Sequence, residues 1–456
     1  MDTNELMRGL PRIDALLESE EASRHIGVLG RAAVVAICRE AVERSKQRAL
    51  ASGAAPDRAL IETDISERLR RARALVLGRV LNGTGVILHT NLGRAPLGAE
   101  LIEVIGEAVG GYCNLEIDVL SRRRGLRGAN VSRLAAQACM AEDAVVVNNN
   151  AAALFLILRE FASGREVIVS RGELVQIGGG FRIPDILEST GATLREVGTT
   201  NITSIRDFSA AMGDETALLL KVHHSNFRMD GFVESPAVRE LAALKTDRTL
   251  LVSDLGTGNL VRRLGGAPLG EPTPADMIEA GADLVCFSCD KLLGGVQGGI
   301  VAGRGDLVER LRRNPVMRVI RVDKLVYAAL EHVLAAHLAG EHGRIPIWRM
   351  AAAGREEVAA RAAAFLEKNG FADPRVSVVD SEATFGGGST PGEIIPSAAV
   401  RLAGTASADA TARWFQEREP PVLGTVRNGA FQLDFRTILE EDEAPLAVAT
   451  IDWLRL

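Results

Sequence analysis

The sequence has no apolar run long enough to cross a bilayer. Runs such as AAALFLIL (151–158) meet a charged residue, Arg159, well short of the roughly 20 residues that a spanning helix requires. The N-terminal stretch MDTNELMRGL lacks the basic and then apolar pattern of a secretory signal. We therefore expect a cytoplasmic protein with no membrane partner.

Cysteine is scarce, and its positions do not suggest a disulfide framework. An odd number of scattered cysteines fits reduced thiols better than disulfides. Cys286-x-x-Cys289 is a candidate redox pair, but it lies in a strand-like run, and no second pair completes a zinc site. We expect no bound metal. The five cysteines are Cys38, Cys113, Cys139, Cys286 and Cys289.

Positive charge is not in excess, since the formal net charge is −6 at pH 7. A nucleic-acid surface must then be a local patch, and no DNA partner is expected. Two arginine clusters qualify, in SERLRRARALVLGR (66–79) and SRRRGLRG (121–128). A salt-bridged helix face explains the first equally well, whereas we expect no acids near the second. The arginines are Arg68, Arg70, Arg71, Arg73 and Arg79, and then Arg122, Arg123, Arg124 and Arg127.

The chain divides into three regions by sequence pattern. Residues 1–75 have helical apolar spacing, which predicts a small all-α N-terminal module. Over 76–330, short apolar runs alternate with helical patterns, as is typical of crossover βαβ units and a largely parallel sheet. Residues 331–456 predict a smaller α+β domain. The predicted class is α/β.

Ligands of open parallel sheets bind beyond the carboxyl ends of the strands, so the residues that follow each apolar run matter most. VVVNNNAAALFLIL (145–158) places asparagines before a helix whose first turn offers N–H groups to an anion, although a capped turn fits equally well. LLLKVHHSNF (218–227) places Asn226 after His223 and His224, which are more often structural. TLLVSDLGTG (249–258) reaches Asp254, which alone is a weak signal because aspartate often caps turns.

Lysine is rare, and one lysine stands apart. Lys291, in CDKLLGGVQGG (289–299), stands alone at a strand exit before a glycine-rich loop, where a planar ligand would have room. An amine can lose its proton near neutral pH and attack a carbonyl, which a guanidinium cannot do. An ordinary surface lysine is the alternative. The six lysines are Lys46, Lys221, Lys245, Lys291, Lys324 and Lys368.

These strand exits together predict a site for pyridoxal 5'-phosphate. That cofactor requires an amine to bind its aldehyde, a carboxylate for its ring nitrogen and an anion cradle for its phosphate. Lys291, Asp254 and the turn at Asn149, Asn150 and Ala151 supply these in the chain order of the aminotransferase-like (fold type I) architecture. Asn226 is a candidate partner for the ring hydroxyl. Neither a G-x-x-x-x-G-K-[ST] motif nor a well-placed G-x-G-x-x-G motif supports a nucleotide instead.

Several long segments of the chain are distinctive: NGTGVILHTNLGRAPL (82–97), SRGELVQIGGGFRIPDI (170–186), FSCDKLLGGVQGGIVAG (287–303) and NPVMRVIRVDKL (314–325). In this order they resemble segments of bacterial selenocysteine synthase, the L-seryl-tRNA(Sec) selenium transferase family. The resemblance runs nearly end to end. It implies a fold type I pyridoxal phosphate enzyme that converts seryl-tRNA(Sec) into selenocysteinyl-tRNA(Sec) with selenophosphate as donor.

The resemblance also implies an assembly and residue roles. The family forms a ring-like decamer built from dimers, with active sites between subunits and an N-terminal domain that grips the tRNA. Lys291 matches the Schiff-base lysine, and Arg94, Arg318 and Arg321 match arginines that hold the anionic donor. Spacing alone makes Arg318 and Arg321 typical of a solvated helix face. We expect Lys291 to remove the α-proton, and loss of the β-hydroxyl to give an aminoacrylyl-tRNA that accepts selenium.

Two alternatives remain open at the level of sequence. A pyridoxal phosphate β-eliminating lyase or aldolase-like enzyme acting on a free amino acid explains Lys291 and Asp254, but it leaves the N-terminal helical module without a role. A tRNA-binding protein that has lost catalysis explains that module, but not the presence of the lysine, the aspartate and the arginines together.

Overall fold

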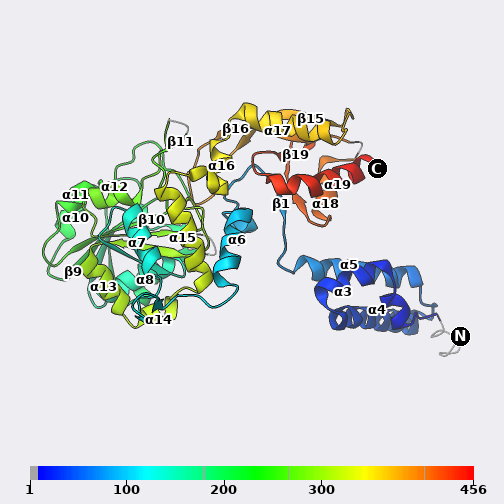
Figure 1. The fold of residues 1–456 in the computed structure, drawn as a ribbon, viewed down its shortest axis with the longest axis horizontal. Coiled ribbons are helices and arrows are strands. Elements are labelled where there is room, and N and C mark those ends of the chain that lie inside the picture. The colour runs from blue at the N-terminus through cyan, green and yellow to red at the C-terminus, as the bar shows by residue number, and fades with distance from the viewer. Residues whose placement is uncertain (1–8, 178–179, 265–266, 405) are drawn as a thin grey trace. The chain divides into compact units, whose positions relative to one another are not determined.

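The structure, a computed structural model, describes residues 9–177, 180–264, 267–404 and 406–456 (Figure 1). The chain forms two compact units, Met1–Arg79 and Val80–Leu456, and each is described by itself. Among the described helices, none is both long and apolar enough to cross a membrane.

The first unit is helical, and Figure 1 shows its helices in blue. The Ser19 hydroxyl accepts from Ala22 N at 3.2 Å and the Asp57 carboxylate from Ala59 N at 2.9 Å, so polar N-caps begin two of these helices. The apolar faces meet in a small core that includes Val34, Cys38 and Leu69. The helices are α2 (Ile13–Leu17), α3 (Glu20–Leu29), α4 (Arg31–Ser52) and α5 (Arg58–Ala74).

The second unit contains a seven-stranded sheet in the order β4-β14-β13-β10-β9-β5-β8. All neighbours pair in parallel except β14, which is antiparallel to both β13 and β4. The predicted α/β class with a mostly parallel sheet is therefore confirmed. The strands are β4 (Asp143–Val147), β5 (Glu166–Ser170), β8 (Thr193–Val197), β9 (Thr216–Val222), β10 (Leu250–Gly256), β13 (Leu284–Ser288) and β14 (Gly299–Gly303).

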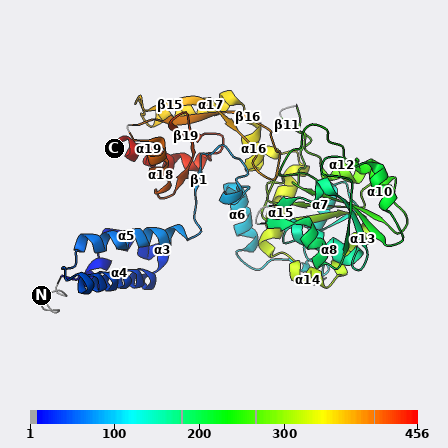
Figure 2. The ribbon, with the colours of Figure 1, turned by 180° about the vertical axis from the view of Figure 1, so that it is seen from behind.

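Both faces of this sheet are covered by helices, because its strands are apolar on both sides (Figure 2). Val146 belongs to one buried cluster, whereas its neighbours Val145 and Val147 belong to the other. The first cluster contains buried residues of α7 and α15, and the second those of α8 and α13. The longer helices around the sheet are α6 (Gly98–Val109), α7 (Ala129–Ala138), α8 (Asn150–Phe161), α13 (Gly305–Arg313) and α15 (Lys324–Leu338).

The C-terminal part has its own four-stranded antiparallel sheet and its own apolar cluster. The chain near residue 81 also joins this part, because β1 pairs in parallel with β17. The fully buried Arg436 donates to the carbonyl oxygens of Ala353 and Pro396, both at 2.7 Å. Its elements are β1 (Leu81–Asn82), α17 (Arg355–Lys368), β15 (Val376–Ala383), β16 (Ile395–Leu402), α18 (Ala408–Gln416), β17 (Val422–Leu423), β18 (Thr425–Arg427), β19 (Ala430–Asp434) and α19 (Glu443–Leu454).

The predicted domain boundaries differ from the observed elements. The first compact unit ends at Arg79, a few residues beyond the predicted end at 75. The predicted boundary between 330 and 331 falls inside α15, whose buried face packs in the core of the large sheet. A separate domain over 331–456 stays a prediction, because these residues lie in the same compact unit as the large sheet.

Short elements connect the larger ones. The helices are α9 (Ile183–Ser189), α10 (Ile205–Ala211), α11 (Val238–Ala242), α12 (Pro274–Glu279), α14 (Val316–Ile320) and α16 (Pro346–Ala352). The paired strands are β2 (Ile117–Asp118) with β3 (Arg123–Arg124), β6 (Gln176–Ile177) with β7 (Phe181–Arg182), and β11 (Arg263–Leu264) with β12 (Ala267–Pro268).

Candidate active site

The carboxyl ends of the parallel strands bring the predicted site residues together. Asp254, near the end of β10, is in register with Val222 on one side and Cys286 on the other. The backbone N–H of His223, just beyond β9, donates to the Asp254 carbonyl oxygen at 2.9 Å. Lys291 follows β13 by three residues. The same edge of the sheet therefore carries the ends of three neighbouring strands and their polar side chains.

Lys291 is a buried lysine, with only 9% of its surface exposed. Its amino group makes no hydrogen bond or ion pair with another described residue. Burial lowers the pKa of this amine and the Arg94 charge lowers it further, while Asp254, Asp290 and Glu271 oppose the shift. The lowered pKa favours the neutral amine, which is the nucleophilic form.

A glycine-rich loop from the C-terminal part passes over Lys291. Gly388 has φ +87°, and a Cβ added to it would lie 3.4 Å from the Lys291 Nζ atom. The next residues, Ser389 and Thr390, are buried, and their hydroxyl groups have no hydrogen-bond partner among the described residues. The loop thus approaches the amine closely and adds two hydroxyl groups that are free to hydrogen-bond a ligand.

Asp254 is linked to the start of α8. Its side chain is 6% exposed and accepts from the Asn150 Nδ2 atom at 2.7 Å. Burial raises the pKa of Asp254, whereas the Asn150 hydrogen bond and the Lys291 charge lower it. A positively charged ligand atom beside this carboxylate would favour its ionised form.

The asparagine turn opens α8 as predicted. The Asn149 side chain caps the helix by accepting from Ala152 N at 2.8 Å, so Asn150 and Ala151 form its first turn. The turn approaches β14 closely, because a Cβ on Gly299 would lie 2.3 Å from the Asn149 carbonyl oxygen. The N–H groups of a first helical turn have no intrahelical partner, and together with the helix dipole they favour an anion.

Arg94 lies beside the lysine. It has φ +67° and forms an ion pair with Asp290, the residue immediately before Lys291. The Asp290 side chain is 8% exposed, whereas that of Arg94 is 39% exposed. Arg94 therefore brings a positive charge next to Lys291 and keeps part of its guanidinium open to solvent.

Arg318 and Arg321 are both exposed, at the end of α14. Within the described residues, neither makes a hydrogen bond or ion pair with the groups around Lys291. Their segment nevertheless touches the asparagine turn, since Asn148 N donates to the Ile320 carbonyl oxygen at 3.0 Å. The single chain thus brings Lys291, Asp254, Asn150 and Arg94 together, but leaves these two arginines at its surface.

Only one of the two polar side-chain atoms of Asn226 has a hydrogen-bond partner among the described residues. Its Nδ2 atom donates to the Gln176 carbonyl oxygen at 3.0 Å, while its Oδ1 atom is buried without a partner. The Nε2 atom of the neighbouring His224 donates to the Gly172 carbonyl oxygen at 2.7 Å, and its ring packs on Phe227, which indicates a structural role.

Several buried polar atoms near these strand ends have no hydrogen-bond partner among the described residues. Buried polar groups of folded proteins are nearly always hydrogen-bonded, so such a group of atoms indicates a polar ligand. A flat ring with one aldehyde, one ring nitrogen, one hydroxyl and one phosphate matches the donors and acceptors present. The atoms are Asn150 Oδ1, His223 Nδ1, Asn226 Oδ1, Thr257 Oγ1, Glu271 Oε2, Ser389 Oγ and Thr390 Oγ1.

Comparison with known proteins agrees with this geometry. The family described as L-seryl-tRNA selenium transferase matches residues 80–439, and the family described as selenocysteine synthase N terminal matches residues 7–45. The chain belongs to the L-seryl-tRNA selenium transferase family.

Relatives in this family match along nearly the whole chain. The L-seryl-tRNA(Sec) selenium transferase of Geotalea daltonii is 40% identical over 97% of this chain and 98% of its own length. The protein of the same name from Rhizobium meliloti is 40% identical over 96% of each chain. A solved D-glucosaminate-6-phosphate ammonia-lyase shares the fold, with a TM-score of 0.57 and 16% identity over 83% of this chain and 96% of its own. The predicted fold type I architecture is confirmed.

Other predictions about this transferase-family chain concern its cysteines and metals. Cys286 and Cys289 are both buried free thiols. Burial raises the pKa of each thiol well above its usual range, which disfavours the reactive thiolate. The described residues contain no group of three or more side chains arranged to bind a metal ion.

One prediction about the arginine clusters is wrong. Glu116 lies within hydrogen-bond reach of the second cluster, at 2.8 Å from Arg124 and 2.7 Å from Arg127. The hairpin of β2 and β3 brings this acid back onto the arginines. In the first cluster, Arg68 pairs with Asp64 at 2.9 Å and with Glu40 at 3.5 Å, as the salt-bridged alternative predicts.

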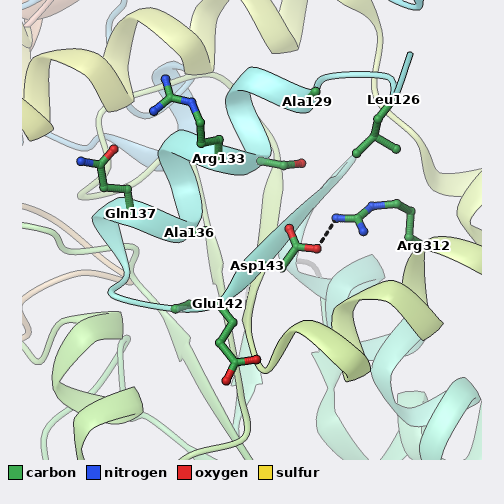
Figure 3. Close-up of a pocket in the computed structure, with 10 residues that line it drawn as sticks. Leu126, Ala129, Arg133, Ala136, Gln137, Glu142, Asp143 and Arg312 are labelled. Carbon is green, nitrogen blue, oxygen red and sulfur yellow. Dashed lines mark hydrogen bonds and ion pairs between the residues drawn. The ribbon is translucent and has the colours of Figure 1, made fainter. Parts of the chain in front are cut away.

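A separate pocket of about 410 Å³ lies at the opposite end of the sheet (Figure 3). Arg312 and Asp143, which pair at 2.7 Å, stand on one side of it, and Arg133 and Gln137 of α7 on another. Because Asp143 begins β4 whereas the candidate site follows the end of that strand, this pocket is not part of the active site.

Sequence reasoning missed three contributors to the site. Glu271 lies in a proline- and glycine-rich loop that is typical of an exposed turn, and the hydroxyls of Ser389 and Thr390 lie in the stretch GGGSTPGE (386–393), whose composition is typical of a loop. Residues this far from the strand ends carry no local signal of their position. The number of glycines around Ser389 was the one available indication of a close approach.

Proposed function

We propose that this chain is a pyridoxal phosphate-dependent transferase that converts L-seryl-tRNA(Sec) into L-selenocysteinyl-tRNA(Sec), with selenophosphate as the selenium donor. The observation that carries the proposal is the buried, unpaired amine of Lys291 at the strand edge that also carries Asp254. Membership of the transferase family, with relatives aligned over nearly the full length, supports the substrate.

The geometry supports an assignment of the residues that would hold the cofactor. Lys291 would bind its aldehyde, Asp254 its ring nitrogen, and the first turn of α8 at Asn150 and Ala151 its phosphate. The Oδ1 atom of Asn226 would accept from the ring hydroxyl. When bound, pyridoxal phosphate supplies an electron sink that stabilises negative charge at the substrate α-carbon.

The chain's own groups then handle protons and anions. Lys291 would take the α-proton of the seryl group, because its lowered pKa suits an amine acting as a base. Arg94, Arg318 and Arg321 would hold the anionic selenium donor, since the planar guanidinium fork matches oxyanions. Burial of the site would limit access of water to the reacting seryl group.

The same proposal includes assembly and tRNA binding. Arg318 and Arg321 are exposed in the single chain, which supports a homo-oligomer, built from dimers into a decamer, whose sites lie between subunits. The helical unit up to Arg79 would bind the tRNA, with exposed Arg71 among its phosphate contacts. We place the reaction in the cytoplasm, where aminoacyl-tRNA is consumed.

The experiment is turnover by purified protein. Pyridoxal phosphate, seryl-tRNA(Sec) and selenophosphate should together give selenocysteinyl-tRNA(Sec), and borohydride reduction followed by peptide mapping should place the label on Lys291. Reaction of free amino acids alone would instead identify a small-molecule lyase, and tRNA binding without turnover would identify a binding protein. Either of those outcomes overturns the proposal.

The tRNA-binding role has its own test. Removal of residues 1–79 should weaken seryl-tRNA(Sec) binding in a filter assay while the absorbance of the bound cofactor is kept. Unchanged tRNA affinity would contradict the role given to this unit.

A further inference from the structure

An acid from a distant loop reaches the site. The carbonyl oxygen of Glu271 accepts from the side chain of the fully buried Asn259 at 2.9 Å, which anchors the loop. The Glu271 side chain is only 9% exposed, and its Oε2 atom has no hydrogen-bond partner among the described residues. That atom lies 3.8 Å from His223 Nδ1, which is itself buried and unpaired.

Glu271 lies at the same strand ends as Lys291, because its Oε2 atom is 3.8 Å from His223 Nδ1 and His223 directly follows β9. The charge on Glu271 raises the pKa of Lys291, and the charge on Lys291 lowers the pKa of both Glu271 and His223. The backbone of His223 is in turn bonded to Asp254. The carboxyl, the imidazole and the amine therefore surround one region at the strand ends.

The other two acids whose charges act on the Lys291 amine are already engaged. Asp290 is paired with Arg94, and Asp254 accepts from Asn150. Glu271 is thus the acid near Lys291 whose buried oxygen is free to interact with a substrate.

The proposed reaction requires one more proton donor than the residues assigned so far. Breaking the Cα–H bond delivers a proton to Lys291, and the electron pair of that bond forms the Cα=Cβ double bond. Breaking the Cβ–O bond releases the hydroxyl group with its bonding pair, so the oxygen must receive a proton to leave as water. A positioned acid typically accelerates such a step by about 10²–10⁴-fold.

We propose that Glu271 is the acid that protonates the departing β-hydroxyl group of the seryl substrate. This inference rests on the proposed function. After the step Glu271 is a carboxylate, Lys291 is an ammonium ion and one water has formed. Transfer of the Lys291 proton to Cα when the selenium nucleophile adds at Cβ, and uptake of a proton by Glu271, restore both groups.

The charges around Glu271 favour this role. Burial, followed by the neighbouring Glu393, raises the pKa of Glu271 to about 7, against the opposing effect of Lys291. A carboxyl group with that pKa is half protonated at neutral pH. Burial lowers the pKa of His223 to about 4, so this imidazole is neutral at pH 7 and does not donate in place of Glu271.

The test is the variant Glu271→Gln in the full-length protein loaded with pyridoxal phosphate. With seryl-tRNA(Sec), water loss should fall by about 10²–10⁴-fold. Exchange of the α-hydrogen with D₂O, which depends on Lys291, should stay close to the wild-type rate. With β-chloroalanyl-tRNA(Sec), whose chloride leaves without a proton, the variant should eliminate nearly as fast as the wild type.

Two outcomes would overturn the inference: water loss at the wild-type rate, or equal loss of activity toward both charged tRNAs, since the latter indicates a purely structural role. Failure of the wild-type protein with both tRNAs would instead contradict the proposed function. The matched control is Glu393→Gln, which removes a neighbouring negative charge. It should retain activity and move the alkaline limb of the water-loss profile to lower pH, and an unmoved limb would count against Glu271.

A readout without turnover completes the test. Difference infrared spectra of the unliganded wild-type protein should contain a carboxylic acid band that titrates near pH 7 and is absent from Glu271→Gln. If the same band persists in the variant, another group carries the proton and the assignment to Glu271 is wrong.

Discussion

The two ends of the seven-stranded sheet differ in how completely their charged side chains are paired. Where the parallel strands begin, Asp283 accepts from Lys245 at 3.0 Å and from Arg304 at 3.4 Å, and Asp143 accepts from Arg312 at 2.7 Å. Where they end, some charges are also paired, such as Lys221 with Glu173. The buried Lys291, however, makes no hydrogen bond or ion pair with another described residue, and the Oε2 atom of Glu271 has no hydrogen-bond partner among them. Paired charges stabilise a fold, whereas unpaired buried charges cost free energy and persist where a ligand or a reaction requires them. The unpaired groups therefore indicate that the candidate active site lies at the carboxyl ends of the parallel strands, independently of any pocket.

The strongest way to break this comparison is to remove the unpaired amine. Lys291→Met should lower turnover by about 10⁴-fold or more, because in the proposed function one group both binds the cofactor and moves the proton. The thermal unfolding temperature should not fall, since no hydrogen bond or ion pair of Lys291 with another described residue is lost. Steady-state kinetics and a thermal melt check the two halves, and a destabilised variant would contradict the view that Lys291 is kept only for chemistry.

A second lysine at the same end sharpens the contrast. Lys221, near the end of β9, pairs with Glu173 at 2.5 Å, and the Glu173 side chain is 2% exposed. Lys221→Met should lower the free energy of unfolding by about 3–5 kcal/mol, because a buried carboxylate loses its counter-charge. Urea unfolding measures this, and the double variant Lys221→Met with Glu173→Gln should recover part of the loss. A neutral effect of the single variant would show that pairing does not distinguish the two lysines.

The unpaired Glu271 and His223 should give opposite pH dependences. Burial raises the pKa of Glu271 from 4.5 to about 7, so its contribution to stability is present below pH 4.5 and is lost as the pH rises to 7. Burial lowers the pKa of His223 from 6.5 to about 4, so stability rises with pH between 4 and 6.5. In the wild type, these two opposite changes of the free energy of unfolding with pH cancel.

Single variants should reveal the pH dependence that each group contributes to the free energy of unfolding. Relative to the wild type, the free energy of unfolding of Glu271→Gln should rise by about 3 kcal/mol between pH 4.5 and 7, and that of His223→Gln should fall by about 3 kcal/mol over a similar range. Urea unfolding across this pH range measures both. Parallel curves for all three proteins would contradict the opposite shifts.

The smallest effect is expected at the paired end. Asp283→Asn should lower the free energy of unfolding by about 2 kcal/mol, because charged hydrogen bonds from Lys245 and Arg304 become neutral ones. Turnover per folded molecule should be unchanged. A large loss of turnover in the soluble variant would show that this end also serves the reaction.

How far the sequence predicts the site depends on how local each signal is. Asp254 and Lys291 were predictable because each lies near the carboxyl end of its own apolar strand, and parallel strands bring these ends to one edge. The asparagine turn was predictable for the same reason, although the hydrogen bond between Asn150 and Asp254 links residues of different strands.

The remaining features depend on tertiary contacts that sequence spacing does not encode. Glu271 reaches the site because Asn259 anchors its loop, and Ser389 reaches it through the C-terminal part of the chain. Glu116 contacts Arg124 and Arg127 because a short hairpin folds back, which made the prediction of an acid-free arginine cluster wrong. The roles of Arg318 and Arg321 stay a prediction.

The approach of Gly388 to the Lys291 amine has a consequence for biosynthesis. These residues are separated by nearly a hundred positions, so Gly388 is translated well after Lys291. A ribosome-bound chain that has just exposed its large sheet still lacks the loop that covers the amine. The surroundings of the amine are therefore complete only after this later loop has been translated and has folded.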